Sequence, residues 1–226
     1  MDIRLGICLP LNNDMVHSQF LDSFIRMEKP DYTYHRPQFP ANATANIAAI
    51  RNGIVRSALE ADRTHILTMD TDQTYPVDTI TKLLKHAEAG CKIVTAKVHR
   101  RYPPFDPLLL RGEVDHYEMV PDEEWMKGGL IKIDATGSAC MLVDTNVFLD
   151  MDYPWYEDGV SPEGKALGED INFCYKARKM GFDIWADTSI LVGHLALVEI
   201  GTVFYEITKL MDRARKNRVQ YQNSED

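Results

Sequence analysis

The sequence has few cysteines and no long apolar run, and these absences exclude several classes of protein. Its four cysteines stand far apart without Cys-x-x-Cys spacing, so neither a zinc site made of cysteines nor a disulfide framework is predicted. No stretch approaches the roughly 20 apolar residues that a transmembrane helix needs. An apolar run begins at Ile3 without a preceding secretion signal. We therefore expect a cytoplasmic protein with buried thiols and no transmembrane segment.

Positive charge is also scarce, and glycine-rich phosphate loops are missing. The chain has 25 Lys and Arg against 34 Asp and Glu, which gives a formal net charge of −9. This balance argues against a surface built for general nucleic-acid binding, although a local basic groove is compatible with it. Neither Gly-x-Gly-x-x-Gly nor Gly-x-x-x-x-Gly-Lys-Ser/Thr occurs, so dinucleotide oxidoreductases and P-loop enzymes are poor matches.

What the chain does contain is an alternation of short apolar runs with helical patterns, which is typical of an α/β sheet. Its 226 residues, 45% of them hydrophobic, are enough for one substantial core. We predict a single domain over residues 1–219 and a polar tail over residues 220–226. The expected strands are Arg4–Leu9, His65–Met69, Lys92–Ala96, Leu108–Leu110, Ile131–Asp134, Ala139–Val143 and Asp183–Trp185.

Helical patterns fill the segments between these strands. They cover residues 42–60, 76–89, 168–180 and 198–218. In the first helix an apolar stripe, expected to pack on the sheet, is formed by Ile47, Ile50, Ile54 and Ala58. Arg51 and Asn52 fall on the opposite, polar side. The second helix is expected to carry Pro76 in its first turn.

The segment with most chemical content follows the strand His65–Met69. Asp70 and Asp72 come two residues apart at its end, where an extended chain points both side chains to one side. Ligands of open α/β sheets bind beyond the carboxyl ends of the strands. Two carboxylates there predict a Mg²⁺ or Mn²⁺ site against a pyrophosphate. The alternative is a pair of aspartates that caps a turn, and we take a second Asp-x-Asp triplet, Asp150–Asp152, as a chance occurrence.

Three later segments add further candidates. The turn Ala135-Thr-Gly-Ser138 precedes an apolar strand, and Gly137 within it would let the backbone approach a ligand closely. Glu169 and Asp170 open a helix, where the positive end of the helix dipole favours them. His194 follows the last strand, and a neutral imidazole is a common ligand for divalent ions.

This order of segments resembles the GT-A glycosyltransferases, especially the compact bacterial and phage-type members. The likeness extends from the first strand to His194. It implies a GT-A type α/β fold, a single domain with a mixed, mainly parallel sheet flanked by helices. It also implies metal binding by Asp72 and His194, and a place for Asp70 at the donor's ribose or at the metal. The acidic pair of Glu169 and Asp170 would supply the catalytic, reaction-facing group.

The same likeness assigns the remaining candidates to the donor. Pro10 would lie near the base, Arg51 near the nucleotide and Gly137 close to the bound ligand, while Arg100 and Arg101 would meet sugar or phosphate. Residues 1–97 would form the nucleotide-sugar half and residues 98–219 the acceptor half.

The implied activity is metal-dependent transfer, with Mn²⁺ or Mg²⁺, from a nucleotide-diphosphate sugar to a hydroxyl acceptor. A small molecule, a glycan, a protein and modified DNA are all compatible acceptors. Many inverting members carry Gln-x-x-Arg-Trp after the acidic pair, and this chain has none there, which favours a retaining reaction.

Two other interpretations stay open. Asp70-Thr-Asp72-Gln-Thr74 also fits the motif of haloacid-dehalogenase-type phosphatases, in which Asp70 would be the nucleophile and Asp72 a general acid. That class needs a later Gly-Asp-x-x-x-Asp segment, and residues 168–172 have the wrong spacing. A non-catalytic nucleotide-sugar-binding protein on the same fold is the other alternative.

Overall fold

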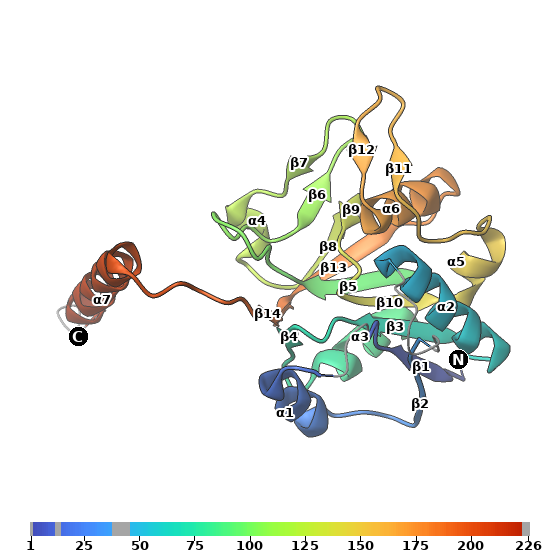
Figure 1. Cartoon of the computed structure of the whole chain (residues 1–226), viewed down its shortest axis with the longest axis horizontal. Helices are drawn as coiled ribbons and strands as arrows, with labels where there is room; N and C mark the ends of the chain where they lie inside the picture. The colour runs from blue at the N-terminus through green and yellow to red at the C-terminus, as the bar shows by residue number, and fades with distance from the viewer. Residues whose placement is uncertain (1, 12–14, 38–45, 223–226) are drawn as a thin grey trace. The chain divides into compact units, whose positions relative to one another are not determined.

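The computed structural model describes residues 2–11, 15–37 and 46–222. A seven-stranded sheet forms the centre of the unit Met1–Leu195, and Figure 1 shows how its strands are arranged. The strands in spatial order are β2 (Tyr32–His35), β1 (Leu5–Cys8), β3 (His65–Met69), β10 (Cys140–Asp144), β5 (Ile93–Lys97), β13 (Ile184–Leu191) and β8 (Leu130–Ile133). All but two run in one direction, since β10 is antiparallel to β3 and β5, and β8 is antiparallel to β13. The prediction of a mixed, mainly parallel sheet is therefore confirmed.

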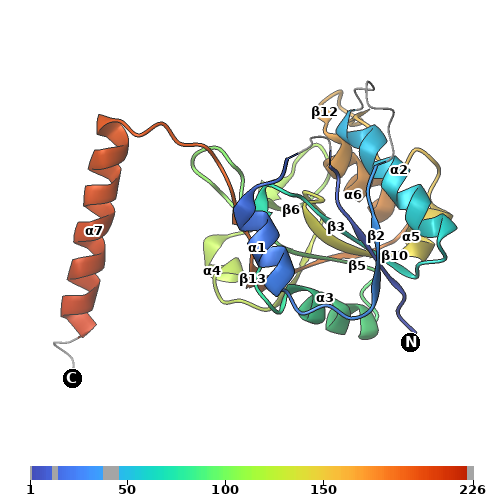
Figure 2. The same cartoon turned by 60° about the horizontal axis from the view of Figure 1, so that its bottom comes forward.

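Helices cover both faces of this sheet (Figure 2). The helices on one face are α2 (Ile47–Glu60), α5 (Thr145–Asp150) and α6 (Glu169–Lys179), and those on the other are α1 (Ser18–Arg26) and α3 (Thr79–Glu88). Successive strand residues alternate between the two cores: in β3, Ile66 packs on the α2 side and Leu67 on the α3 side. The sheet is buried on both faces, which explains the continuous apolar runs of its central strands.

Shorter strands lie beside the main sheet. They are β4 (Gln73–Thr74) with β14 (Gly193–His194), β6 (Leu109–Arg111) with β7 (Glu118–Met119) and β9 (Ala135–Thr136), and β11 (Gly159–Val160) with β12 (Ala166–Leu167). A short helix, α4 (Asp122–Trp125), follows β7. The strand predicted at Leu108–Leu110 thus exists, but it belongs to a separate three-stranded sheet.

The last helix, α7 (Thr202–Gln222), belongs to a second unit that covers Ala196–Asp226, whereas Met1–Leu195 form the compact unit with the sheet. The helix begins and ends four residues later than the predicted segment of residues 198–218, and it includes the first residues of the predicted polar tail; residues 223–226 lie outside the described part. None of the described helices is both long and apolar enough to cross a membrane. The division of the chain after residue 97 stays a prediction.

The helix predicted to open with Pro76 begins at Thr79, so the proline precedes it. The Pro76 carbonyl accepts a hydrogen bond from the Thr79 amide at 3.2 Å. The helix predicted from residue 42 begins at Ile47 with Asn46 as its N-cap, and residues 42–45 lie outside the described part.

Arg51 and Asn52, which the sequence places on the polar side of α2 opposite the apolar stripe, do not face solvent. Both are buried, with 4% and 5% of their surface exposed, because α2 packs on a second side against the segment before β11. The Asn52 amide donates to the Tyr156 carbonyl at 2.6 Å and its oxygen accepts from the Tyr156 amide at 3.0 Å. A buried side-chain amide thus satisfies both backbone groups of one residue.

We expect Asn52→Ala to lower the free energy of unfolding by about 2–3 kcal/mol, because it leaves two buried backbone groups unpaired. Urea titration followed by circular dichroism measures this change. Glu60→Ala, at the exposed end of the same helix, is the control and should stay within about 0.5 kcal/mol. Equal effects of the two substitutions would show that this side-chain bridge contributes nothing.

Candidate active-site cleft

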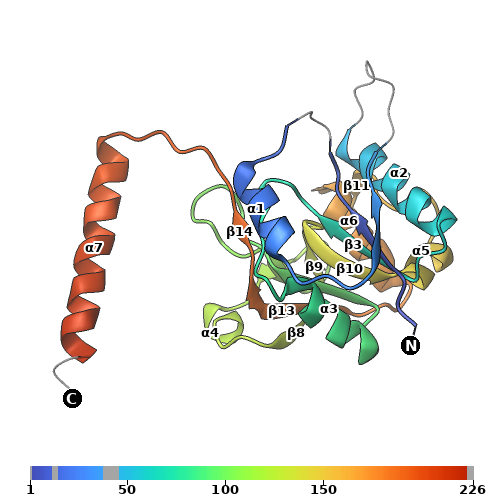
Figure 3. The same cartoon turned by 90° about the horizontal axis from the view of Figure 1, so that it is seen from below.

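A cavity of about 530 Å³ lies beyond the carboxyl ends of β1 and β3, between the start of α1 and the first turns of α2. Figure 3 shows the backbone of these elements. Its size falls within the usual range of small-molecule sites. Its walls come from the end of β1, the start of α1, the first turns of α2, the segment after β3 and the segment after β5. The lining residues are Pro10, Met15, Val16, His17, Ile47, Arg51, Asp70, Thr71, Asp72 and Arg101.

Arg51 is the buried centre of the inner wall. Its guanidinium lies 3.2 Å from an Asp70 carboxylate oxygen, 3.4 Å from Glu169 Oε1 and 3.2 Å from the Ser138 carbonyl oxygen, to which it donates. These contacts join α2, the end of β3, the turn before β10 and the start of α6. Burial on its own lowers the pKa of Arg51, but the neighbouring carboxylates and Tyr156 outweigh it and raise the pKa above its usual value. Arg51 is therefore a permanent cation at this position.

Asp72 and His194 form a second polar group at the outer end of the cleft. The pairing of β4 with β14 places them together: Gly193 is opposite Thr74, and the Leu195 amide donates to the Asp72 carbonyl at 2.8 Å. Glycine is needed in β14, since a Cβ on Gly193 would lie 2.5 Å from Thr74 Oγ1. His194 Nε2 then lies 3.4 Å from Asp72 Oδ2.

The other ring nitrogen of His194 fixes its tautomer. Nδ1 lies 2.7 Å from the carbonyl oxygen of His99, which can only accept, so Nδ1 carries a proton. Nε2 therefore faces Asp72: its N–H donates to the carboxylate when the ring is protonated, and its lone pair is free for a cation when the ring is neutral. Burial lowers the pKa of His194, but hydrogen bonding to Asp72 and His99 outweighs this and raises the pKa above its ordinary value. The pKa of Asp72 is lowered, because contacts with His194 and Arg101 outweigh the opposite effect of burial.

The donor set of this pair fits a divalent cation. A backbone carbonyl that orients a histidine ligand through its second nitrogen is common at metal sites. Two ligand atoms that are each about 2.1 Å from an ion and subtend a right angle at it lie about 3 Å apart. This separation is close to the 3.4 Å between Asp72 Oδ2 and His194 Nε2. Within the described residues, no three His, Cys, Asp or Glu side chains are arranged so that together they could hold a metal ion. An ion here would therefore need oxygen ligands from water or from a substrate.

Asp170 lies deeper, at the first turn of α6. Burial, and next the negative charge of Glu169, raise the pKa of Asp170 to about 6. Its Oδ1 accepts from the Ile171 amide at 2.8 Å. A Cβ on Gly137 would lie 3.3 Å from Asp170 Oδ2, so a larger residue at this position would crowd this carboxylate.

The structure gathers most of the predicted site residues, but not all of them. Five of them line the cavity: Pro10, Arg51, Asp70, Asp72 and Arg101. Two more lie beside it, because His194 contacts Asp72 and Glu169 contacts Arg51. Asp70 is paired with Arg51 rather than turned towards Asp72, so the predicted three-residue metal group of Asp70, Asp72 and His194 is reduced to two. Arg100 does not line the cavity, and its guanidinium lies 4.0 Å from the Met119 sulfur.

The sequence interpretation missed the wall formed by Met15, Val16 and His17. Met15 is 85% exposed, which is unusual for a large apolar side chain beside polar ones. Ile47 was expected to pack on the sheet, yet it is 37% exposed and lines the same cavity. An apolar wall opposite carboxylates and an arginine suits a ligand with a planar or apolar part and a charged part.

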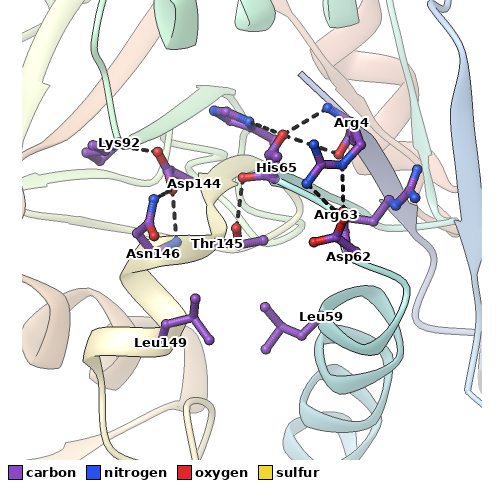
Figure 4. A pocket seen from close by; sticks show the side chains of 11 residues that line it. Arg4, Leu59, Asp62, Arg63, His65, Lys92, Asp144, Thr145, Asn146 and Leu149 are labelled. Carbon is purple, nitrogen blue, oxygen red and sulfur yellow. Dashed lines mark hydrogen bonds and ion pairs between the residues drawn. The ribbon is translucent and has the colours of Figure 1, made fainter. Parts of the chain in front are cut away.

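A second cavity, of about 420 Å³, lies at the opposite end of the strands, around His65 at the start of β3 (Figure 4). Two of its cations are paired with carboxylates: Arg4 lies 3.0 Å from Asp62, and Lys92 lies 2.6 Å from Asp144. Asp144 is also the N-cap of α5. These contacts hold the beginnings of β1, β3 and β5 together.

Comparisons with known proteins agree with this architecture. No family model and no curated protein matches the chain in sequence. The fold is similar to the crystal structure of A197 from STIV, with a TM-score of 0.58 and 14% identity over 86% of this chain and 87% of that one. It is also similar to GalNAc-T7 with UDP, GalNAc and Mn²⁺, with a TM-score of 0.55 and 10% identity over 87% of this chain and 44% of that one.

These likenesses establish the fold class. The chain has a GT-A-like α/β fold, as the sequence predicted, and it spans less than half the length of the GalNAc-T7 chain. At such identities the likeness carries the fold alone, so activity must be argued from the cleft.

The raised pKa of Asp170 predicts a pH-dependent cost to stability. Folded protein binds the Asp170 proton more tightly than unfolded protein does. The contribution of this proton to the stability of the fold is therefore complete below about pH 4 and is lost as pH rises past about 6. Asp170→Asn should therefore stabilise the protein at pH 8, by roughly 3 kcal/mol at most, and leave it unchanged at pH 4. Melting curves at both pH values test this, with the exposed Asp158→Asn as the control for lost charge. A less stable Asp170→Asn protein at pH 8 would contradict the assignment.

Proposed function

We propose that the protein is a glycosyltransferase that moves a sugar from a nucleotide-diphosphate donor to a hydroxyl acceptor. The observation that carries the proposal is the meeting of Asp72, with an oriented His194, and the Arg51–Asp70 pair at one cavity beyond the strand ends. Support from outside the cleft comes from the GT-A-like fold shared with GalNAc-T7, whose structure contains UDP, GalNAc and Mn²⁺.

In this proposal the inner wall binds the nucleoside. Pro10, Met15 and Ile47 provide apolar surface for the base, and Asp70, held by Arg51, accepts hydrogen bonds from the ribose hydroxyls. Arg51 contributes chiefly by fixing Asp70, since its Nη2 donates to that carboxylate and its Nη1 to the Ser138 carbonyl. Arg101, at the outer end, faces the phosphates.

Asp72 and His194 Nε2 would hold Mn²⁺ or Mg²⁺ at the diphosphate end of the donor. When bound, the ion neutralises the negative charge that develops on the leaving nucleoside diphosphate. One carboxylate and one imidazole leave most coordination positions for phosphate oxygens and water, which is the usual arrangement for ions that act on phosphates.

The four cysteines are unpaired, which supports the proposed cytoplasmic location.

Glu169 and Asp170 would face the reacting sugar and the acceptor. Retention of configuration is proposed because Gln-x-x-Arg-Trp is missing after this pair. One observation favours inversion as a second candidate: a carboxylate with a pKa of about 6 is suited to accept the acceptor's proton at neutral pH. The configuration of the new glycosidic bond, read by NMR, decides between them.

A panel of nucleotide sugars, with and without Mn²⁺, tests the activity. Thermal shift should identify one donor that stabilises the fold only with the ion, by about 2.7 kcal/mol at 100 times its dissociation constant. Slow, metal-dependent hydrolysis of that donor should follow. The phosphatase alternative predicts instead a beryllium fluoride or phosphate adduct on Asp70, and a non-catalytic binder predicts the thermal shift without hydrolysis.

Asp72→Asn should reduce transfer by at least about a hundredfold while leaving the fold intact, because the neutral amide cannot replace the anionic ligand. Asp152→Asn is the matched control, since it makes the same change in an exposed Asp-x-Asp triplet and should keep full activity. Rates with the identified donor and melting curves for both variants check this. A folded, active Asp72→Asn protein would remove the metal assignment.

His194→Ala should raise the Mn²⁺ concentration for half-maximal activity by at least about tenfold, roughly 1.4 kcal/mol, with partial rescue by excess Mn²⁺. Because a purely structural histidine would lower stability and leave the metal dependence unchanged, the Mn²⁺ titration must be paired with a melting curve. The His86→Ala variant, whose ring contacts Asp187 away from the cleft, serves as the control.

A further inference from the structure

We propose that Arg101 is an exchangeable counter-ion of the cleft: it neutralises Asp72 when no donor is bound and passes to the donor's diphosphate when the donor enters. The proposal rests on the proposed function. It adds a specific consequence, namely that Arg101 opposes binding of the free ion and favours binding of the ion together with a nucleoside diphosphate.

The same oxygen of Asp72 serves both partners. Arg101 Nη1 lies 2.9 Å from Asp72 Oδ2, and His194 Nε2 lies 3.4 Å from that same atom. A cation held between Asp72 and His194 through this oxygen would replace the contact between the Arg101 guanidinium and Asp72. Arginine and metal ion are therefore in competition.

The segment that carries Arg101 is anchored at its base. The bridge between His99 and Pro107, and the hydrogen bond from the Arg100 amide to the Asp106 carbonyl at 2.9 Å, close the segment between β5 and β6 into a hairpin-like loop. The His99 carbonyl in this base is the group that orients His194. The loop thus contacts both proposed metal ligands. The backbone carbonyl of His99 contacts His194, and the side chain of Arg101 contacts Asp72.

The Arg101 side chain itself can move. It is 48% exposed, and a single ion pair of this kind contributes only about 0.2–1 kcal/mol, so a stronger anion can displace it. A guanidinium matches the geometry of phosphate oxygens, and Arg101 already lines the cavity in which a diphosphate would lie. The Arg101 guanidinium can therefore pass from the Asp72 carboxylate to the diphosphate by rotation of the side chain, without rearrangement of the loop base.

The neighbouring arginine provides a matched control. Arg100 belongs to the same loop and carries the same charge, but it does not line the cavity and its guanidinium lies near the Met119 sulfur. Arg100→Ala changes the net charge and the loop composition as Arg101→Ala does. A difference between the two variants therefore reports the Asp72 contact.

The test uses isothermal titration of the full chain, first with Mn²⁺ alone and then with UDP or GDP at saturating Mn²⁺. Arg101→Ala should bind Mn²⁺ alone about two- to fivefold more tightly than wild type, the size of a half-exposed ion pair. The same variant should bind the diphosphate with Mn²⁺ more weakly, by about fivefold or more. Arg100→Ala should resemble wild type in both titrations, and melting curves should show all three proteins folded.

Opposite signs in the two titrations are the signature of an exchangeable counter-ion. Weaker binding of both ligands by Arg101→Ala, or equal Mn²⁺ affinity in the Arg100 and Arg101 variants, overturns the proposal. Asp72→Asn separates this failure from that of the proposed function. If Asp72→Asn abolishes Mn²⁺ binding while Arg101→Ala leaves it unchanged, the metal site stands and the counter-ion role falls; if Asp72→Asn binds Mn²⁺ like wild type, both fall.

Discussion

The buried charge of Arg51 is the constraint on which the arrangement of the cleft depends. A buried arginine, here with 4% of the residue's surface exposed, is tolerated only where carboxylates and carbonyl groups meet its guanidinium, because removal of the charge from water is otherwise too costly. Asp70, Glu169 and the Ser138 carbonyl come from three different elements, and each must reach the same side chain of α2. Satisfying this one cation therefore fixes the end of β3, the turn before β10 and the start of α6 at a common point beside the cavity.

Much of the sheet could be predicted from the sequence because its central strands are buried on both faces. His65–Met69 was predicted with the bounds that the structure has, since five buried residues stand between a turn and Asp70. The edge strand Tyr32–His35 was missed because its half-exposed polar and aromatic residues carry no continuous apolar signal. Helix α1 was missed for a related reason: among its residues only Phe20 is buried, and the apolar Leu21 and Ile25 are exposed.

The candidate site divides in the same way between local and tertiary information. The spacing of Asp70 and Asp72 after a strand is a local signal, and both residues line the cavity. What each carboxylate pairs with is tertiary: Asp70 is drawn to Arg51, and Asp72 meets His194 only because β4 and β14 pair across 122 positions of sequence. The burial of Arg51 was not predicted, because helical periodicity describes one packed face, whereas α2 is packed on two.

The most direct test of the metal-assisted cleft is a crystal structure with Mn²⁺ and a nucleoside diphosphate, with data collected at a wavelength where manganese scatters anomalously. We predict one anomalous peak within about 2.3 Å of both Asp72 and His194 Nε2, with diphosphate oxygens completing the coordination and the nucleoside against Pro10 and Asp70. A diphosphate bound in the cleft without an ion at this position, or an ion held elsewhere, would contradict the account.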